Sequence, residues 1–201
     1  MFSAKTYAAR RNMLRTKIGS GIILLPGNSL SPNNYPNNAY YFRQDSSFRY
    51  YFGLNTPSLA GLIDADTGEE ALYGDDFTVE DIIWTGPQPT LRELGAEVGV
   101  TATFPMAELE KRLRKAVSLG RKIHYLPPYR GETKLQLSAL LGIKPELLHD
   151  YKSVELMFAV AEMREKKSAE EIEEMERAFQ IGYKTVSYTH LRAHETLSDL
   201  V

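Results

Sequence analysis

The chain has 201 residues, with 24 basic and 26 acidic side chains and a formal net charge of −2. This balance leaves no surplus charge of the kind that attracts nucleic acid or a charged membrane surface. With 43% hydrophobic residues, 25% charged residues and no cysteine, the composition is typical of a globular domain. It excludes a disulfide framework, a thiolate nucleophile and a cysteine-ligated metal.

The first half of the chain predicts one helix followed by short strands and turns. Ser3 can cap a helix to about Lys17, whose basic residues we expect on a solvated face. Asp45 can cap a second, short helix over residues 46–51 that ends at Gly53. Short apolar runs predict strands at residues 22–25, 39–42, 59–64, 70–73 and 82–84. The third and fourth flank an Asp-Thr-Gly turn, so they are expected to form a hairpin.

The second half is expected to be richer in helix. Apolar residues at helical spacing predict helices over residues 107–119, 133–141 and 153–163, and a strand is predicted at 122–126. Strands that alternate with helices indicate an α/β domain, and the hairpin makes its sheet mixed rather than purely parallel. The one apolar run near the N-terminus, residues 22–25, is too short for a signal peptide or a membrane helix.

A domain boundary is predicted near Met163. A charged cluster, Arg164–Lys167, is followed by Ser168 and, three residues later, Glu171. This spacing is a capping box, which opens a helix.

The last residues contain a histidine pair with the spacing of metal ligands. His190 and His194 lie one helical turn apart, with Glu195 beside them. However, residues 186–196 resemble the in-frame translation of a transposase-type sequencing adaptor over eleven consecutive positions. We therefore treat residues 186–201 as not native, expect no contribution from them to folding or metal binding, and expect the natural protein to continue.

Two histidines lie outside this tail. His124 is expected to pack in the core from its predicted strand, and His149 beside Asp150 is expected to be solvated. Two separated histidines without cysteine do not indicate a zinc site.

The run from Tyr41 to Gly53 resembles the signature of the N-terminal domain of Xaa-Pro aminopeptidases (aminopeptidase P). Its signature positions here are Arg43, Gln44, Asp45, Ser46 and Phe48. Residues 57–63 are similar to the next strand of that family, residues 81–86 to its Ile-Trp-x-Gly segment, and residues 161–172 to the junction with its catalytic domain. Together these segments extend the resemblance over residues 1–185.

The resemblance implies a mixed six-stranded sheet flanked by helices over residues 1–163, with residues 164–185 as the junction and first helix of a missing catalytic domain. It implies a cytoplasmic parent metallopeptidase that removes an N-terminal residue preceding proline. It also implies dimers or tetramers in which this domain borders the active site of the neighbouring subunit. In that family two Mn²⁺ ions are held by two Asp, one His and two Glu of the catalytic domain. We therefore expect no catalytic residue and no metal ligand in this chain, and neither nucleic acid nor a membrane as partner.

Trp84, the only tryptophan, is the candidate for contact with substrate. It is predicted to end a strand, where an indole can lie either in the core or at a domain edge. The resemblance favours the mouth of the adjacent subunit's active site. A departure from the family lies near Asn37, where relatives often carry an acidic residue.

Three alternatives remain open from the sequence. A prolidase or creatinase N-domain would have the same fold with another substrate, although the Ile-Trp-x-Gly segment favours aminopeptidase P. A non-catalytic binding module, as in certain histone chaperones, would be expected to carry acidic runs. A free-standing structural domain is disfavoured by the adaptor-like tail.

Overall fold

The computed structural model describes residues 2–35 and 38–192, with side chains as far as residue 186. It divides into two units, Met1–Met163 and Arg164–Val201. In the described residues, no helix is both long enough and apolar enough to cross a bilayer.

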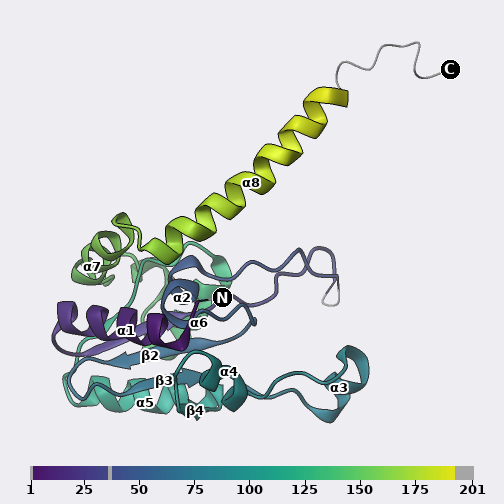
Figure 1. The fold of residues 1–201 in the computed structure, drawn as a ribbon. Coiled ribbons are helices and arrows are strands. Elements are labelled where there is room, and N and C mark those ends of the chain that lie inside the picture. The colour runs from purple at the N-terminus through teal and green to yellow at the C-terminus, as the bar shows by residue number, and fades with distance from the viewer. Residues whose placement is uncertain (1, 36–37, 193–201) are drawn as a thin grey trace. The chain divides into compact units, whose positions relative to one another are not determined.

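The first unit is built on a mixed sheet with the strand order β4-β3-β2-β1-β5 (Figure 1). β1 (Ile22–Pro26) and β3 (Glu70–Tyr73) both pair antiparallel with β2 (Ala60–Asp64). β1 also pairs in parallel with β5 (Ile123–His124), and β3 pairs in parallel with β4 (Ala102–Phe104). Four strands therefore run in one direction, and β2 alone runs against them.

Helices cover both faces of this sheet. The bounds of the helices in this unit are α1 (Ala4–Ile18), α2 (Ser46–Phe52), α3 (Val79–Thr85), α4 (Leu91–Glu97), α5 (Met106–Ser118), α6 (Gly131–Leu141), the 3-10 turn η1 (Pro145–Leu147) and α7 (Val154–Glu165). Among the α-helices that the structure describes in this unit, α3 alone contributes no buried residue. The alternation along β1 sends Ile23 and Leu25 to one face, where α1, α2, α4 and α7 contribute the core. Ile22 and Leu24 face the opposite core, which α5 and α6 cover.

The predicted caps are confirmed. The Ser3 side chain accepts a hydrogen bond from the Thr6 amide at the start of α1. Asp45 Oδ1 accepts from the amides of Ser47 and Phe48, both at 2.9 Å, and Gly53 ends α2 with a positive φ of 70°.

The α/β class and the mixed sheet are confirmed, but the expected strand count is wrong. The described residues form five strands, not six. In the described residues, 39–42 make one isolated bridge, between Pro32 and Ala39, and form no strand. Residues 82–84 belong to the helix α3, and β4 was not predicted at all.

The basic residues of α1 are not all solvated, which corrects a second expectation. Arg11 is completely buried and Arg10 is 8% exposed. The Arg10 guanidinium lies 4.1 Å from the centroid of the Tyr50 ring and 4.8 Å from that of Phe2, and it donates to the Tyr50 carbonyl at 3.0 Å. These aromatic faces and carbonyls replace the water that the charge loses on folding.

The second unit is dominated by α8 (Ala169–Arg192). Its predicted capping box is confirmed: the Ser168 amide donates to Glu171 Oε2 at 2.8 Å, and the Glu171 amide donates to Ser168 Oγ at 3.2 Å. The side chains of residues 187–201, including His190 and His194, lie outside the described part, so the expectations for them stay predictions.

Candidate functional site

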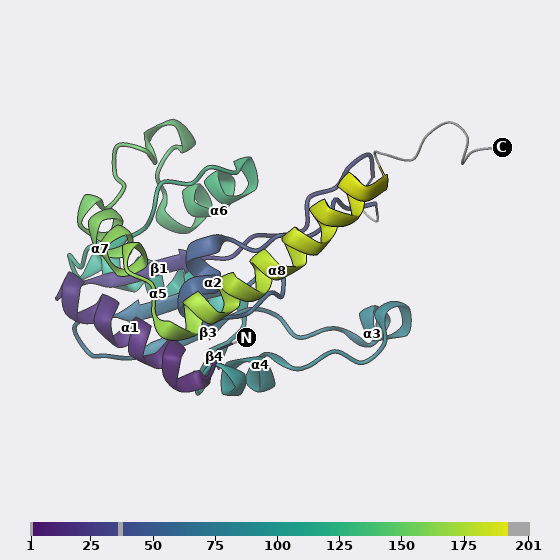
Figure 2. The same ribbon diagram turned by 45° about the horizontal axis from the view of Figure 1, so that its top comes forward.

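One edge of the sheet collects the carboxyl ends of four strands. Because β1, β3, β4 and β5 run in the same direction, the segments that follow them leave from the same edge. Ligands of open α/β sheets commonly bind outside such an edge. The segments concerned are residues 27–45 after β1, residues 74–90 after β3 and residues 125–130 after β5. The first two project well beyond the sheet (Figures 1 and 2).

Gln44 joins the two ends of the segment that follows β1. Its side chain is 4% exposed, and Oε1 accepts hydrogen bonds from the amides of Asn28 at 2.6 Å and Asp45 at 2.9 Å. Its Nε2 donates to the Thr56 carbonyl at 2.7 Å. The Asn28 side chain in turn donates to the Arg43 carbonyl at 2.9 Å. Gln44 therefore fixes where the loop after β1 begins and ends.

The other signature residues have different environments. Phe48 is fully buried and stacks on Phe52 with ring centroids 5.3 Å apart, so it is a core residue. Asp45 is the N-cap of α2, and Arg43 and Ser46 are exposed beside the N-terminal end of this helix. Gln44, Asp45 and Phe48 therefore have structural roles, in the loop after β1, at the start of α2 and in the core.

Trp84 lies in the short helix α3, and the strand predicted at 82–84 is wrong. Thr78 and Asp81 form a capping box: the Thr78 amide donates to Asp81 Oδ2 at 2.9 Å and the Asp81 amide to Thr78 Oγ1 at 3.2 Å. Hydrogen bonds from Thr78 also hold the pKa of Asp81 below its ordinary value. The indole of Trp84 is 83% exposed, so it is not a core residue.

Exposed aromatic residues on the neighbouring segments were missed by the sequence analysis. Tyr40 and Tyr41 are 60% and 98% exposed on the loop after β1, and Tyr129 is 70% exposed after β5. Three tyrosines within the polar stretch 27–41, among Asn, Pro and Ser, were the available clue. Asn37, at the departure from the family pattern, lies outside the described residues.

His124 is buried, as expected, and each of its ring nitrogens has a hydrogen-bond partner. Nε2 lies 3.1 Å from the Ser20 carbonyl, and Nδ1 lies 2.7 Å from Ser153 Oγ. Burial and the neighbouring Lys122 ammonium lower the pKa of His124. His149 is exposed.

Comparison with known proteins identifies the family. The family described as "Aminopeptidase P, N-terminal domain" matches residues 7–125, which is more than half of the chain. The chain belongs to the aminopeptidase P N-terminal domain family. No curated protein sequence matched it.

The structural neighbours of this aminopeptidase P N-terminal domain include several forms of the Escherichia coli aminopeptidase P. A Glu-to-Ala variant in complex with substrate has a TM-score of 0.72 and 20% identity, over 90% of this chain and 43% of that one. An Asp-to-Ala variant has a TM-score of 0.70 and 20% identity, over 88% and 42%. At this identity the likeness shows the fold alone. The chain spans less than half the length of these neighbours.

Residues of this aminopeptidase P N-terminal domain do not fit the two Mn²⁺ ions that the resemblance implies. Among the side chains that the structure describes, those of residues 2–35 and 38–186, no three His, Asp or Glu side chains are grouped as metal ligands. No step of a metal-dependent reaction is therefore assigned to this part of the chain.

Proposed function

We propose that the chain is the non-catalytic N-terminal domain of a metallo-aminopeptidase that releases an N-terminal residue preceding proline. In this proposal residues 1–163 form the N-terminal domain, residues 164–185 lead into the catalytic domain that holds the Mn²⁺ ions, and residues 186–201 are not native. The parent protein assembles into cytoplasmic dimers or tetramers, and the segment around Trp84 borders the active site of a neighbouring subunit.

The observation that carries the proposal is the exposure of α3. None of its seven residues is buried, and Val79, Ile83 and Trp84 are each at least 75% exposed. A helix of this length is marginal in water without packing partners, and clustered exposed apolar side chains are typical of interaction sites. A partner surface that covers α3 would remove this apolar area from water.

The aromatic character of this edge supports a proline-containing peptide as substrate. Tyr40, Tyr41 and Tyr129 are exposed on segments that leave the sheet at the same edge as the Trp84 segment. Extended proline-containing peptides are commonly recognised by aromatic-lined surfaces. Contacts of this kind position a substrate and exclude water, without taking part in bond cleavage.

The test uses the natural full-length protein with Mn²⁺ and measures release of the first residue from an Xaa-Pro peptide and from the matching Xaa-Ala peptide. We expect cleavage before proline only, and none from residues 1–201 alone. Cleavage by the short chain would contradict the non-catalytic assignment. Hydrolysis restricted to Xaa-Pro dipeptides or to creatine would contradict the aminopeptidase assignment.

The role of Trp84 is tested separately in the same full-length protein. We expect Trp84→Ala to raise KM or lower kcat for the Xaa-Pro peptide by about tenfold, as the loss of one well-packed aromatic contact would do. Phe158→Ala is the matched control, because Phe158 is also highly exposed, at 72%, but belongs to α7, which is far from the Trp84 segment in sequence. Equal kinetics for both variants would contradict the role of Trp84.

A further inference from the structure

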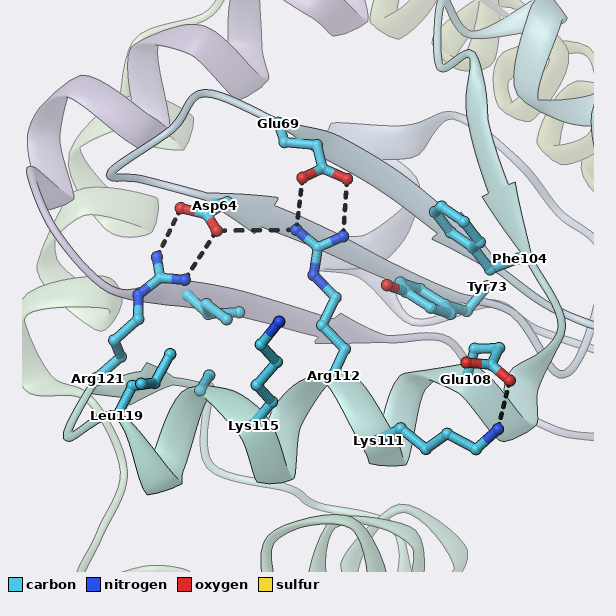
Figure 3. Close-up of a pocket in the computed structure, with 12 residues that line it drawn as sticks. Asp64, Glu69, Tyr73, Phe104, Glu108, Lys111, Arg112, Lys115, Leu119 and Arg121 are labelled. Carbon is cyan, nitrogen blue, oxygen red and sulfur yellow. Dashed lines mark hydrogen bonds and ion pairs between the residues drawn. The ribbon is translucent and has the colours of Figure 1, made fainter.

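A groove lies beside α5, against the sheet face that α5 and α6 cover (Figure 3). Its volume is about 460 Å³, within the range of small-molecule sites, roughly 300–1,000 Å³. One wall is a stripe of side chains from α5 and its C-cap residue, spaced three or four residues apart, namely Glu108, Lys111, Arg112, Lys115 and Leu119. The adjacent stripe, Leu109, Leu113 and Ala116, is buried in the core, so this wall is firmly anchored.

Two arginines of the groove are fixed by carboxylates. Arg121 donates to both oxygens of Asp64, at 2.6 and 2.9 Å, and Arg112 donates to both oxygens of Glu69, at 2.8 and 2.9 Å. The hydrogen bonds from Arg112 hold the pKa of Glu69 below its ordinary value. Burial opposes ionisation of Asp64, but the hydrogen bonds and charge of Arg121 together with hydrogen bonds from Thr67 outweigh it, so the pKa of Asp64 is lowered as well. Both pairs therefore persist at neutral pH.

Lys115 is the surplus cation of this groove. The third carboxylate of the lining, Glu108, is paired with Lys111 at 2.6 Å. Lys115 stands between Arg112 and Arg121, and its side-chain ammonium has no hydrogen-bond or ion-pair partner in the part of the chain that the structure describes (Figure 3). The lining thus carries four cations against three carboxylates.

Further donors are available beside Lys115. An arginine has five N–H donors in a planar fork. Arg112 donates two of them to Glu69, and its Nη2 also lies 3.7 Å from Asp64 Oδ2, which leaves other N–H groups for a ligand. An oxyanion that meets Lys115 could therefore be met by Arg112 as well, without breaking either carboxylate pair.

The other end of the groove is aromatic. The rings of Tyr73 and Phe104 are stacked with centroids 5.6 Å apart. Tyr73 is buried, with 1% exposed, so Phe104, with 37% exposed, is the ring that a ligand can contact. Aromatic faces of this kind favour a flat, apolar ligand body. The groove is also larger than a bare inorganic anion would need, since pockets of its size accept small organic molecules.

We propose that this groove binds a small organic oxyanion, an aryl phosphate or aryl carboxylate, with its anionic group at Lys115 and its ring against Phe104. The proposal is independent of the proposed peptidase function, because the groove and the Trp84 segment involve different residues.

The test is a calorimetric titration of the 201-residue chain with phenyl phosphate, with benzoate and with inorganic phosphate. We expect saturable binding of at least one aryl anion, tighter than that of inorganic phosphate. Tighter binding of phenyl phosphate or of benzoate supports the proposal in either case and identifies the class of anion. Lys115→Gln should weaken the aryl anion about tenfold, which corresponds to about 1.4 kcal/mol.

Two further variants separate the parts of the site. Phe104→Ala should reduce the affinity for the aryl anion towards that for inorganic phosphate. Lys134→Gln is the matched control, because Lys134 is an exposed lysine on α6 outside the groove lining, and it should bind as the unmodified chain does. Absence of saturable binding, or equal loss in the Lys115 and Lys134 variants, would overturn the proposal. Circular dichroism of each variant checks that it has folded.

Discussion

Arg11 on α1 and Glu70 at the start of β3 form an ion pair of 2.6 Å in which the arginine side chain is completely buried. The other guanidinium nitrogens donate to the carbonyls of Tyr51 and Val98, each at 3.0 Å. The group also lies 5.2 Å from the centroid of the Phe52 ring. One side chain therefore connects the first helix, the end of α2, the sheet and the end of α4.

Replacing this arginine should destabilise the domain strongly. Arg11→Met removes the partner of Glu70 and leaves two carbonyls without a donor, so we expect a loss of about 3–5 kcal/mol in the free energy of unfolding. Urea denaturation measures it. Lys5→Met, at an exposed position of α1, should change stability by less than about 0.5 kcal/mol. A similarly small loss for Arg11→Met would show that the buried network is not required.

Gln44 should matter for stability more than for chemistry. In Gln44→Ala the amides of Asn28 and Asp45 lose their acceptor, and we expect a loss of about 1–3 kcal/mol. The amides of the loop after β1 should also exchange faster with deuterium. Gln88→Ala, at an exposed position, serves as the control. Unchanged exchange at Asn28 would contradict the assigned role.

The lowered pKa of His124 predicts a dependence of stability on pH. Burial and Lys122 disfavour the charged ring in the folded protein, and the nearby carboxylates of Glu155 and Asp66 only partly compensate. The unfolded chain therefore binds this proton more tightly. Its contribution to stability should be fully present above about pH 6.5 and should decline as the pH falls below that value, towards the lowered pKa of the folded state.

The pH effect is measured by urea denaturation between about pH 5 and pH 7.5, a range around the ordinary pKa of histidine. His124→Gln should flatten the decline. His149→Gln should leave it intact, because His149 is exposed. A decline that survives in His124→Gln would assign the effect to another group.

Trp84 should contribute little to the stability of this chain. Its side chain is exposed, so Trp84→Ala should change the free energy of unfolding by less than about 0.5 kcal/mol. Phe48→Ala, which truncates a fully buried aromatic residue, should lose about 3–5 kcal/mol. A loss of that size for Trp84→Ala would mean that the indole is packed, and its proposed role in substrate contact would fail.

Features decided by nearby residues could be predicted from the sequence. The caps at Ser3, Asp45 and Ser168 depend on amides two or three residues away. The β2–β3 hairpin depends on its short turn, in which Asp64 Oδ1 accepts from the amides of Asp66 and Thr67. Each of these was placed correctly because the groups that form the interaction lie within a few positions of one another.

Features decided by distant partners could not be predicted in this way. β4 has only three residues and exists because β3 lies beside it, about thirty positions earlier. The burial of Arg11 depends on Glu70 and Val98, which no local pattern connects to α1. At the candidate site, the resemblance drew attention to Gln44 and Trp84, but the bonding of Gln44 to Thr56 and the exposure of Trp84 required the structure.

The pairing of β1 has a consequence for the order of folding. β1 pairs with β2, and β2 pairs with β3, within about fifty residues, whereas the parallel partner of β1, β5, begins at Ile123, a hundred residues after Ile22. Closing the longer loop carries the larger entropy loss, and long-range parallel pairing is intrinsically slow. The meander of β1, β2 and β3 with α1 and α2 can therefore assemble while a ribosome is still synthesising the segment that will add β5. Until that segment is synthesised, β1 has no paired strand on one side, and the apolar face of the sheet that α5 and α6 will cover remains exposed to water.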